Sequence, residues 1–246
     1  MKKLDWQREP ISHRPISIVL LGDGATAAAP ELMNALREVW ATHEGVQVIL
    51  AGVVLGEGLQ SGAHPPPDRA AWEYVTLPAG EGYGPTLAAA LDMARHPQLL
   101  TILGDVCPSA EDLHLVRQAV DDVDIVCGVS PAGGWVRTGL RKVRQLVWGA
   151  CMGVHVSDPW CPIRLYRRHI LERIVIQSRG RFADVEVIAK ANFLDALIGE
   201  VVLSRTYATR LAREHVLGDM WRVFRRPAFR SVAQQAVEAS PSAARS

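Results

Sequence analysis

The residue best suited to bind a cation is Asp105. It follows Gly104 and the apolar run 99–103, which the pattern predicts to be a buried strand. Ligands of open α/β sheets bind at the carboxyl ends of the strands, so an acid at this point is placed to meet one. Mg²⁺ is held by one or two carboxylates together with substrate phosphates and water. Asp105 is therefore the candidate metal ligand; the alternative is that it only caps a turn.

A glycine-rich loop precedes that strand and the helix leading into it. Gly80, Gly82 and Gly84 alternate with Glu81 and Tyr83. Because glycine has no Cβ, such a backbone can approach a ligand closely. Gly82 and Gly84 are thus candidates for binding a donor or its phosphates, although the same pattern also occurs in ordinary loops.

A second group of candidates lies in the later half, at Asp158 and Arg164. Arg164 stands between Ile163 and Leu165, so on a strand its side chain points away from theirs. This arrangement predicts a guanidinium facing a site, or a structural ion pair with Asp158 or Glu186. Asp158 precedes a proline, which also makes it a good turn former.

Glu186 lies in the apolar run 182–189, where an unpaired charge is costly. We interpret it as a structural partner of an arginine rather than a catalyst, and we interpret Glu200 in the same way.

The elements that position these residues alternate in type along the first half. Apolar runs predict strands, and helical spacing predicts the segments between them. The predicted strands are 16–21, 46–55, 72–77, 99–103 and 124–129, and the predicted helices are 30–40, 85–95 and 111–120. This order is typical of an α/β sheet with parallel pairs.

The later half has a different pattern of elements. It predicts strands at 163–166 and 198–207, and helices at 137–148, 167–174 and 182–192. A basic amphipathic segment follows at 211–224, and the tail from 231 has the composition of a disordered chain.

The whole chain excludes several classes of protein. Its 246 residues carry a net charge of +1, which predicts no nucleic-acid partner. Four cysteines without a CxxC pair predict neither a structural zinc site nor a disulfide framework, as expected for a cytoplasmic protein. The polar N-terminus predicts no signal peptide. No apolar run is long enough for a membrane span.

Several motifs, taken in their order along the chain, resemble those of the family 2 glycosyltransferases of GT-A fold. The resemblance is nearest to the dolichyl- or polyprenyl-phosphate sugar synthases. Residues 158–168 are similar to the family's Asp-x-x-x-Gly-Phe-Arg-x-Tyr-Arg-Arg. Residues 181–186 resemble its Arg-Phe-x-x-x-Glu helix, residues 199–201 its following strand, and residues 82–94 its glycine loop and helix. The resemblance implies a mixed, mainly parallel sheet flanked by helices.

The resemblance also implies a function. The protein would transfer a hexose from a nucleotide-sugar to a polyprenyl-phosphate or other acceptor, with Mg²⁺ or Mn²⁺ bound at Asp105. Arg141 and Arg164 would clamp phosphates, and Asp158 would position the acceptor. The family's Asp-x-Asp is reduced here to Gly104-Asp105, and its donor-site acids after the first two strands are absent.

Those departures leave two other interpretations open. One is a catalytically inactive relative that acts as a binding or scaffold protein. The other is a nucleotidyltransferase-like enzyme, which needs a basic loop near residue 24 that the chain lacks. The sugar, the base, the acceptor, the oligomeric state and any role of Cys107 stay open.

The predicted organisation is an extension (1–15), a catalytic domain (16–210), a basic amphipathic segment (211–230) and a tail (231–246). Within the third part, residues 221–226 read Trp-Arg-Val-Phe-Arg-Arg. Such a segment suits peripheral contact with the anionic inner face of a membrane, or a helix packed onto the domain.

Overall fold

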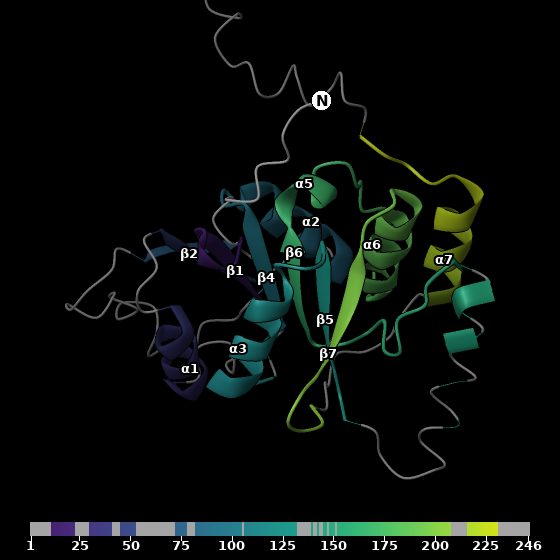
Figure 1. Cartoon of the computed structure of the whole chain (residues 1–246). Coiled ribbons are helices and arrows are strands. Elements are labelled where there is room, and N and C mark those ends of the chain that lie inside the picture. The colour runs from purple at the N-terminus through teal and green to yellow at the C-terminus, as the bar shows by residue number, and fades with distance from the viewer. Residues whose placement is uncertain are drawn as a thin grey trace, which may run out of the picture.

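The computed structural model describes 11–22, 30–40, 45–52, 72–77, 82–104, 106–131, 139, 142, 145, 146, 148–150, 152–207 and 216–230. Within these residues one sheet runs through the molecule (Figure 1). Its strands are β1 (Ile16–Leu21), β2 (Val46–Ala51), β3 (Glu73–Leu77), β4 (Gln98–Leu103), β5 (Ile125–Val129), β6 (Ile163–Arg167) and β7 (Ile198–Val202).

The strand order is β3-β2-β1-β4-β6-β5-β7. Strand β6 runs antiparallel to both β4 and β5, and the other pairs are parallel. This confirms the mixed, mainly parallel sheet expected from the sequence. Because β6 is reversed, its first residues lie beside the last residues of β4.

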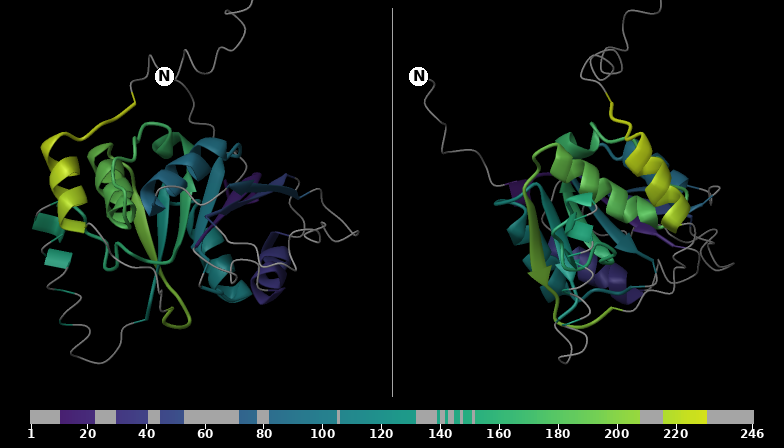
Figure 2. Two further views of the ribbon diagram at one scale, coloured as in Figure 1. Left: turned by 180° about the vertical axis from the view of Figure 1, so that it is seen from behind. Right: turned by 90° about the vertical axis from the view of Figure 1, so that its right-hand side faces the viewer.

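Helices cover both faces of the sheet, as the views from the front, back and side show (Figures 1 and 2). They are α1 (Pro30–Trp40), α2 (Tyr83–Met93), α3 (Ala110–Ala119), α5 (Arg168–Leu171), α6 (Phe182–Phe193) and α7 (Val216–Arg225), with a short 3-10 turn at Ile11–His13. Helices α1 and α3 share one apolar core with one sheet face, and α2, α5 and α6 share a second core with the other. A sheet buried on both faces explains why every residue of β1 is buried and all but Ser17 are apolar.

Several predicted boundaries agree with the structure, and others need correction. The strand 16–21 and the helix 30–40 agree residue for residue. The predicted helix 167–174 is a single turn, α5, because Ile174 instead forms a β-bridge with Phe229. The predicted strand 198–207 ends at Val202, because Ser204 and Tyr207 turn to bind Asp112.

Two terminal segments pack onto the sheet domain. Ser12, assigned by the sequence to the extension, is buried and hydrogen-bonded to Asp121. Helix α7 packs on α6 at the outer side of the molecule (Figure 2). In the part of the chain that the structure describes, no helix has both the length and the apolar character needed to cross a bilayer.

Candidate functional site

The candidate site lies at the carboxyl edge of β1 and β4. Leu103 donates its backbone N–H to the Pro162 carbonyl at 3.0 Å, and Gly104 donates to the carbonyl of Leu21. A Cβ on Gly22 would lie 3.1 Å from the Cα of Gly104, so the two strand ends are in close contact. Asp105 itself lies outside the described residues. Its neighbours Gly104 and Val106 are fixed at this edge.

The turn that opens with Asp158 lies at the same edge. The Asp158 carboxylate accepts from the Trp160 backbone N–H at 3.3 Å, and its carbonyl accepts from Cys161 at 3.0 Å. The turn leads into Pro162, which pairs with Leu103 beside position 105. The turn of Asp158 thus lies beside the end of β4, and the Asp158 carboxylate stabilises that turn, which was the alternative role considered for it.

Glu200 supports this turn from β7. Its carboxylate accepts from the backbone N–H and, at 2.7 Å, from the hydroxyl of Ser157. The prediction of an arginine partner for Glu200 was wrong, because its carboxylate binds the side chain and backbone N–H of Ser157 instead.

Arg164 is buried, with 3% of its surface exposed. One terminal nitrogen is 2.7 Å from an Asp184 oxygen, and the other donates to the Pro159 carbonyl at 2.7 Å. The side chain points away from its two apolar neighbours as predicted, but into an ion pair. The partner is Asp184, so the expected pairing with Asp158 or Glu186 was wrong. In this arrangement both terminal nitrogens are committed within the protein.

Asp184 is the centre of a buried network that the sequence analysis missed. Its second oxygen lies 3.1 Å from Arg181, and the Tyr83 hydroxyl donates to its first oxygen at 2.8 Å. Burial lowers the pKa of Arg164, but the Asp184 carboxylate together with Cys161, Tyr166 and Cys127 raises that pKa well above its ordinary value. The signal was present, because Arg181 and Asp184 are three residues apart at a helix start.

A second buried pair lies one turn further along α6. Lys190 is 2.6 Å from Glu186, whose carboxylate also accepts from the backbone N–H groups of Gln177 and Ser178 at 2.9 Å. Glu186 is thus a structural ion-pair partner as predicted, but of a lysine rather than an arginine.

Gly82 and Gly84 pack against the protein's own backbone. A Cβ on Gly84 would lie 1.8 Å from the Ser178 carbonyl oxygen, and its N–H donates to the Arg179 carbonyl at 2.9 Å. Gly82 has φ +142°, a conformation that favours glycine. These contacts favour the ordinary-loop interpretation, because the Gly84 amide is already used within the protein.

Asp112 connects the carboxyl edge of the sheet to the later half of the chain through hydrogen bonds. Its carboxylate accepts from the backbone N–H of Ser204 at 2.7 Å and from the Tyr207 hydroxyl at 2.5 Å. That hydroxyl in turn accepts from the Ser109 backbone N–H at 3.2 Å. Segment 204–207 therefore holds the loop that follows Asp105. No motif in the sequence pointed to this anchor.

The described residues offer Asp105 little help with a metal ion. They contain no group of three histidine, cysteine or acidic side chains placed to hold one. Burial raises the pKa of Cys107, which keeps it a neutral thiol and a poor ligand for a hard cation. With the described residues alone, a cation at Asp105 would need substrate phosphates and water to complete its ligands.

The basic residues expected to bind phosphate are described in part. Arg141 and Arg144 lie outside the described residues. Lys142, next to Arg141 in the sequence, is exposed on a helical segment.

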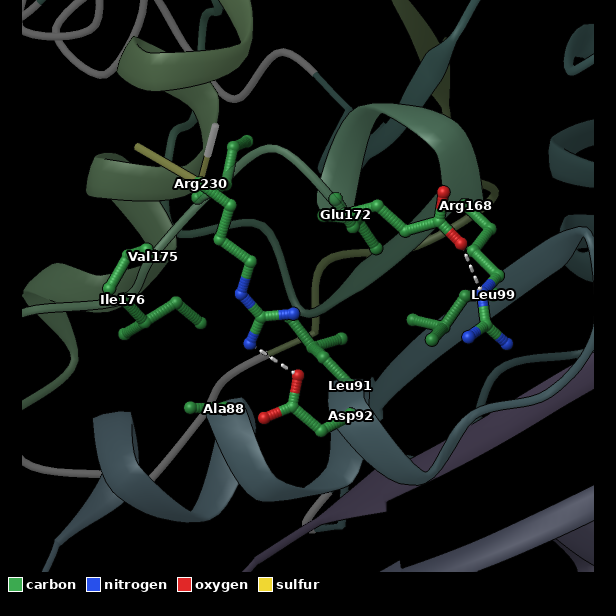
Figure 3. A pocket seen from close by; sticks show the side chains of 11 residues that line it. Ala88, Leu91, Asp92, Leu99, Arg168, Glu172, Val175, Ile176 and Arg230 are labelled. Carbon is green, nitrogen blue, oxygen red and sulfur yellow. Dashed lines mark hydrogen bonds and ion pairs between the residues drawn. The ribbon is translucent and has the colours of Figure 1, made fainter. Parts of the chain in front are cut away.

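A cavity of about 770 Å³ lies away from this edge, beside the start of β4 (Figure 3). Arg230 and Asp92 pair across it at 2.7 Å, and Arg168 pairs with Glu172 at 2.8 Å. Its apolar floor includes Leu91 and Leu99. None of the residues predicted for the site lines it.

Comparison with known proteins supports the resemblance. No family model matches the chain. The undecaprenyl-phosphate 4-deoxy-4-formamido-L-arabinose transferase of Aeromonas hydrophila subsp. hydrophila is 23% identical over 183 residues, covering 72% of this chain and 53% of that protein. The chain thus spans about half the length of this curated relative.

Solved structures of glucosyl-3-phosphoglycerate synthase from Mycobacterium tuberculosis have a similar fold. The complex with Mn²⁺, UDP and phosphoglyceric acid aligns with a TM-score of 0.65 at 13% identity, over 91% of this chain and 86% of that one. The complex with Mg²⁺ and UDP gives 0.63 at 15% identity, over 87% and 81%. The expected GT-A fold, and the resemblance to glycosyltransferases of that fold, are confirmed.

Proposed function

We propose that the protein transfers a hexose from a nucleotide diphosphate sugar to a lipid phosphate. The observation that carries the proposal is the carboxyl edge of the GT-A sheet, where Gly104 and Val106 are fixed on either side of Asp105. The turn of Asp158 lies against the same strand end through Pro162 and Leu103. In open α/β sheets this edge is where ligands bind.

The chemistry requires few side chains. The acceptor oxygen attacks the anomeric carbon, the bond from that carbon to the diphosphate breaks, and the diphosphate leaves. A divalent cation at Asp105 would supply charge stabilisation for the leaving group. In the proposal Asp105 binds the divalent cation, Arg141 contacts the diphosphate and Asp158 orients the acceptor.

Among the described residues at this edge, Asp158 and Glu200 already accept hydrogen bonds from the protein, which favours a phosphate acceptor. A hydroxyl acceptor needs a general base to remove its proton. A phosphate oxygen is already ionised near neutral pH and needs none. The Aeromonas relative is named for an undecaprenyl-phosphate acceptor, which agrees with this reasoning.

Calorimetry with UDP- and GDP-hexoses in the presence of Mn²⁺ tests donor binding. We expect Asp105→Asn to weaken binding by about 100-fold, because a charge partner of the diphosphate is lost. The matched control is Asp122→Asn, an exposed acid in the turn between α3 and β5. Absence of binding to every donor, or equal binding by both variants, would contradict the proposal.

The acceptor is tested separately. The protein is incubated with a radiolabelled nucleotide-hexose and polyprenyl phosphate, and the label that passes into an organic extract is measured. Transfer to the lipid phosphate, but not to the matching polyprenol, is the expected result. Donor binding without transfer to either lipid would overturn the acceptor while leaving the donor site in place.

A further inference from the structure

Helix α7 turns large apolar side chains toward solvent. Leu217, Trp221 and Phe224 are 75%, 64% and 65% exposed. They are spaced four and three residues apart, so they lie on one face of the helix. Exposed apolar residues that occur singly need no explanation, but a row of three containing two aromatic rings indicates an interaction surface.

The opposite face fixes the helix to the domain. Asp219, only 1% exposed, accepts from the backbone N–H groups of Arg179 and Gly180 at 3.1 and 2.9 Å. Val223 is buried beside it. Because these inward contacts set the rotation of the helix, the apolar row is held outward. Helix α7 itself lies at the edge of the molecule (Figure 2).

The surroundings of this row are strongly basic. Arg222, Arg225 and Arg226 are exposed on and just after the helix. Residues 210–230 contain six arginines and only two acids, Glu214 and Asp219, in a chain whose net charge is +1. Asp219 pairs with Arg222 at 3.4 Å and Asp92 pairs with Arg230 at 2.7 Å, so Arg225 and Arg226 supply most of the exposed positive charge beside the row.

We propose that the outward face of α7, formed by Leu217, Trp221 and Phe224 with Arg225 and Arg226 beside it, docks on the surface of an anionic phospholipid bilayer. Tryptophan favours the headgroup level of a bilayer, and arginine reaches phosphates while its stem stays among apolar atoms. Charge complementarity selects a bilayer over an apolar protein groove, because arginines flank the apolar row.

This docking surface does not depend on the proposed sugar transfer. Helix α7 holds the 179–180 backbone through Asp219, and that backbone packs against Gly82 and Gly84 at the start of α2.

Co-sedimentation of the full chain with vesicles tests the proposal. One set contains phosphatidylcholine with about 30% phosphatidylglycerol, and the other phosphatidylcholine alone. We expect binding to the anionic set, weakened as NaCl is raised from about 0.1 M to about 0.5 M. Leu217→Ser/Trp221→Ser/Phe224→Ser is expected to lower the partition coefficient by at least about 100-fold. Arg225→Gln/Arg226→Gln is expected to lower it about tenfold.

The matched control is Leu115→Ser, an apolar residue that is 40% exposed on α3. Helix α3 lies on the other face of the sheet (Figure 1), so this change should leave vesicle binding unaltered. The circular dichroism of every variant should match that of the parent, because each replaced side chain is exposed.

The proposal would be overturned by no binding to anionic vesicles, by binding that the triple variant retains, or by binding that Leu115→Ser weakens equally. Dimerisation in light scattering, abolished by the triple variant in the absence of vesicle binding, would also overturn it. That outcome would assign the face to a second copy of this chain.

Discussion

The carboxyl edge around position 105 and the region around α6 use charge in opposite ways. At the edge, Asp105 follows a strand whose described surroundings contain no cluster of metal-binding side chains. Around α6, Arg164, Arg181, Asp184, Glu186 and Lys190 are all nearly inaccessible and pair with one another. The region richest in charged motif residues is therefore a framework, and the sparse edge is where a ligand would meet the protein.

The difference shows what a motif resemblance measures. Arg164, Arg181 and Glu186 carry much of the likeness to the glycosyltransferase family, and each one is explained by a buried contact. Their presence supports the fold, whereas the proposed chemistry depends on Asp105 and its neighbours. If this division is correct, framework substitutions should lower stability and edge substitutions should lower ligand binding.

The largest expected effect is that of Asp184→Asn. The substitution leaves two buried guanidiniums without their anion, and removing one partner of a buried ion pair typically costs about 3–5 kcal/mol. The free energy of unfolding, measured by urea denaturation, should fall by that amount.

Asp92→Asn is the matched control for Asp184→Asn. It removes a carboxylate that pairs with Arg230 at 2.7 Å but is 55% exposed. Such a surface pair contributes about 0–1 kcal/mol. Equal losses in the two variants would mean that the buried network is not what holds α6, and the comparison of the two regions would fail.

A smaller loss is expected for Gly84→Ala, about 1–3 kcal/mol, the usual range for overpacking a filled site. The added methyl would lie 1.8 Å from the Ser178 carbonyl oxygen, so α2 or the 178–179 backbone must shift. Thermal unfolding measures the loss.

Gly218→Ala on α7 provides the contrast to Gly84→Ala, because a Cβ there meets no atom within 4 Å. Alanine is favoured over glycine within a helix, so this variant should gain about 0.5–1 kcal/mol. If Gly84→Ala does not change the stability, Gly84 would again be a candidate for binding a ligand.

Local patterns predicted the first half of the fold well. The apolar run of β1 and the helical spacing of α1 depend on neighbouring residues, so their limits could be read from the sequence. The reversed placement of β6 between β4 and β5 could not, because a five-residue strand carries no local signal of its direction or its neighbours.

The candidate site was predictable only in its outline. Alternation around Arg164 correctly gave the side on which the guanidinium lies. A site-facing arginine and a buried ion pair produce the same alternation, and only the packing of α6 brings Asp184 to it. Contacts such as Asp112 with Tyr207 join residues almost a hundred positions apart, and no spacing rule reports them.

Asp112→Ala should sharpen the description of the edge itself. The substitution removes the acceptor of hydrogen bonds from the exposed Ser204 and from the half-buried Tyr207, at a cost of about 1–2 kcal/mol. Because these bonds hold the loop after Asp105, the amides of Val106, Cys107 and Ser109 should exchange hydrogen faster. Asp122→Ala, exposed in the turn between α3 and β5, should change neither quantity. Unchanged exchange in Asp112→Ala would show that the loop is held by other contacts.

The smallest expected effect is on the pH dependence of stability, and it comes from Tyr83 in the region around α6. Burial, reinforced by the Asp184 carboxylate, raises the pKa of Tyr83 well above its ordinary value of 10.0. Above pH 10 the unfolded chain therefore loses this proton while the folded protein keeps it, so stability falls as the pH rises. Below pH 10 both states hold the proton, and the tyrosine contributes no slope.

Tyr83→Phe removes that titration and one hydrogen bond to Asp184. At neutral pH the variant should be less stable by about 1 kcal/mol. Between pH 10 and 11 its free energy of unfolding should fall less than that of the parent, by up to about 1.4 kcal/mol per pH unit. Urea denaturation at pH 8, 10 and 11 measures both the loss of stability and its change with pH. Identical slopes would mean that the hydroxyl is reached by solvent, and the framework around Asp184 would then be open to ligands in the same way as the edge.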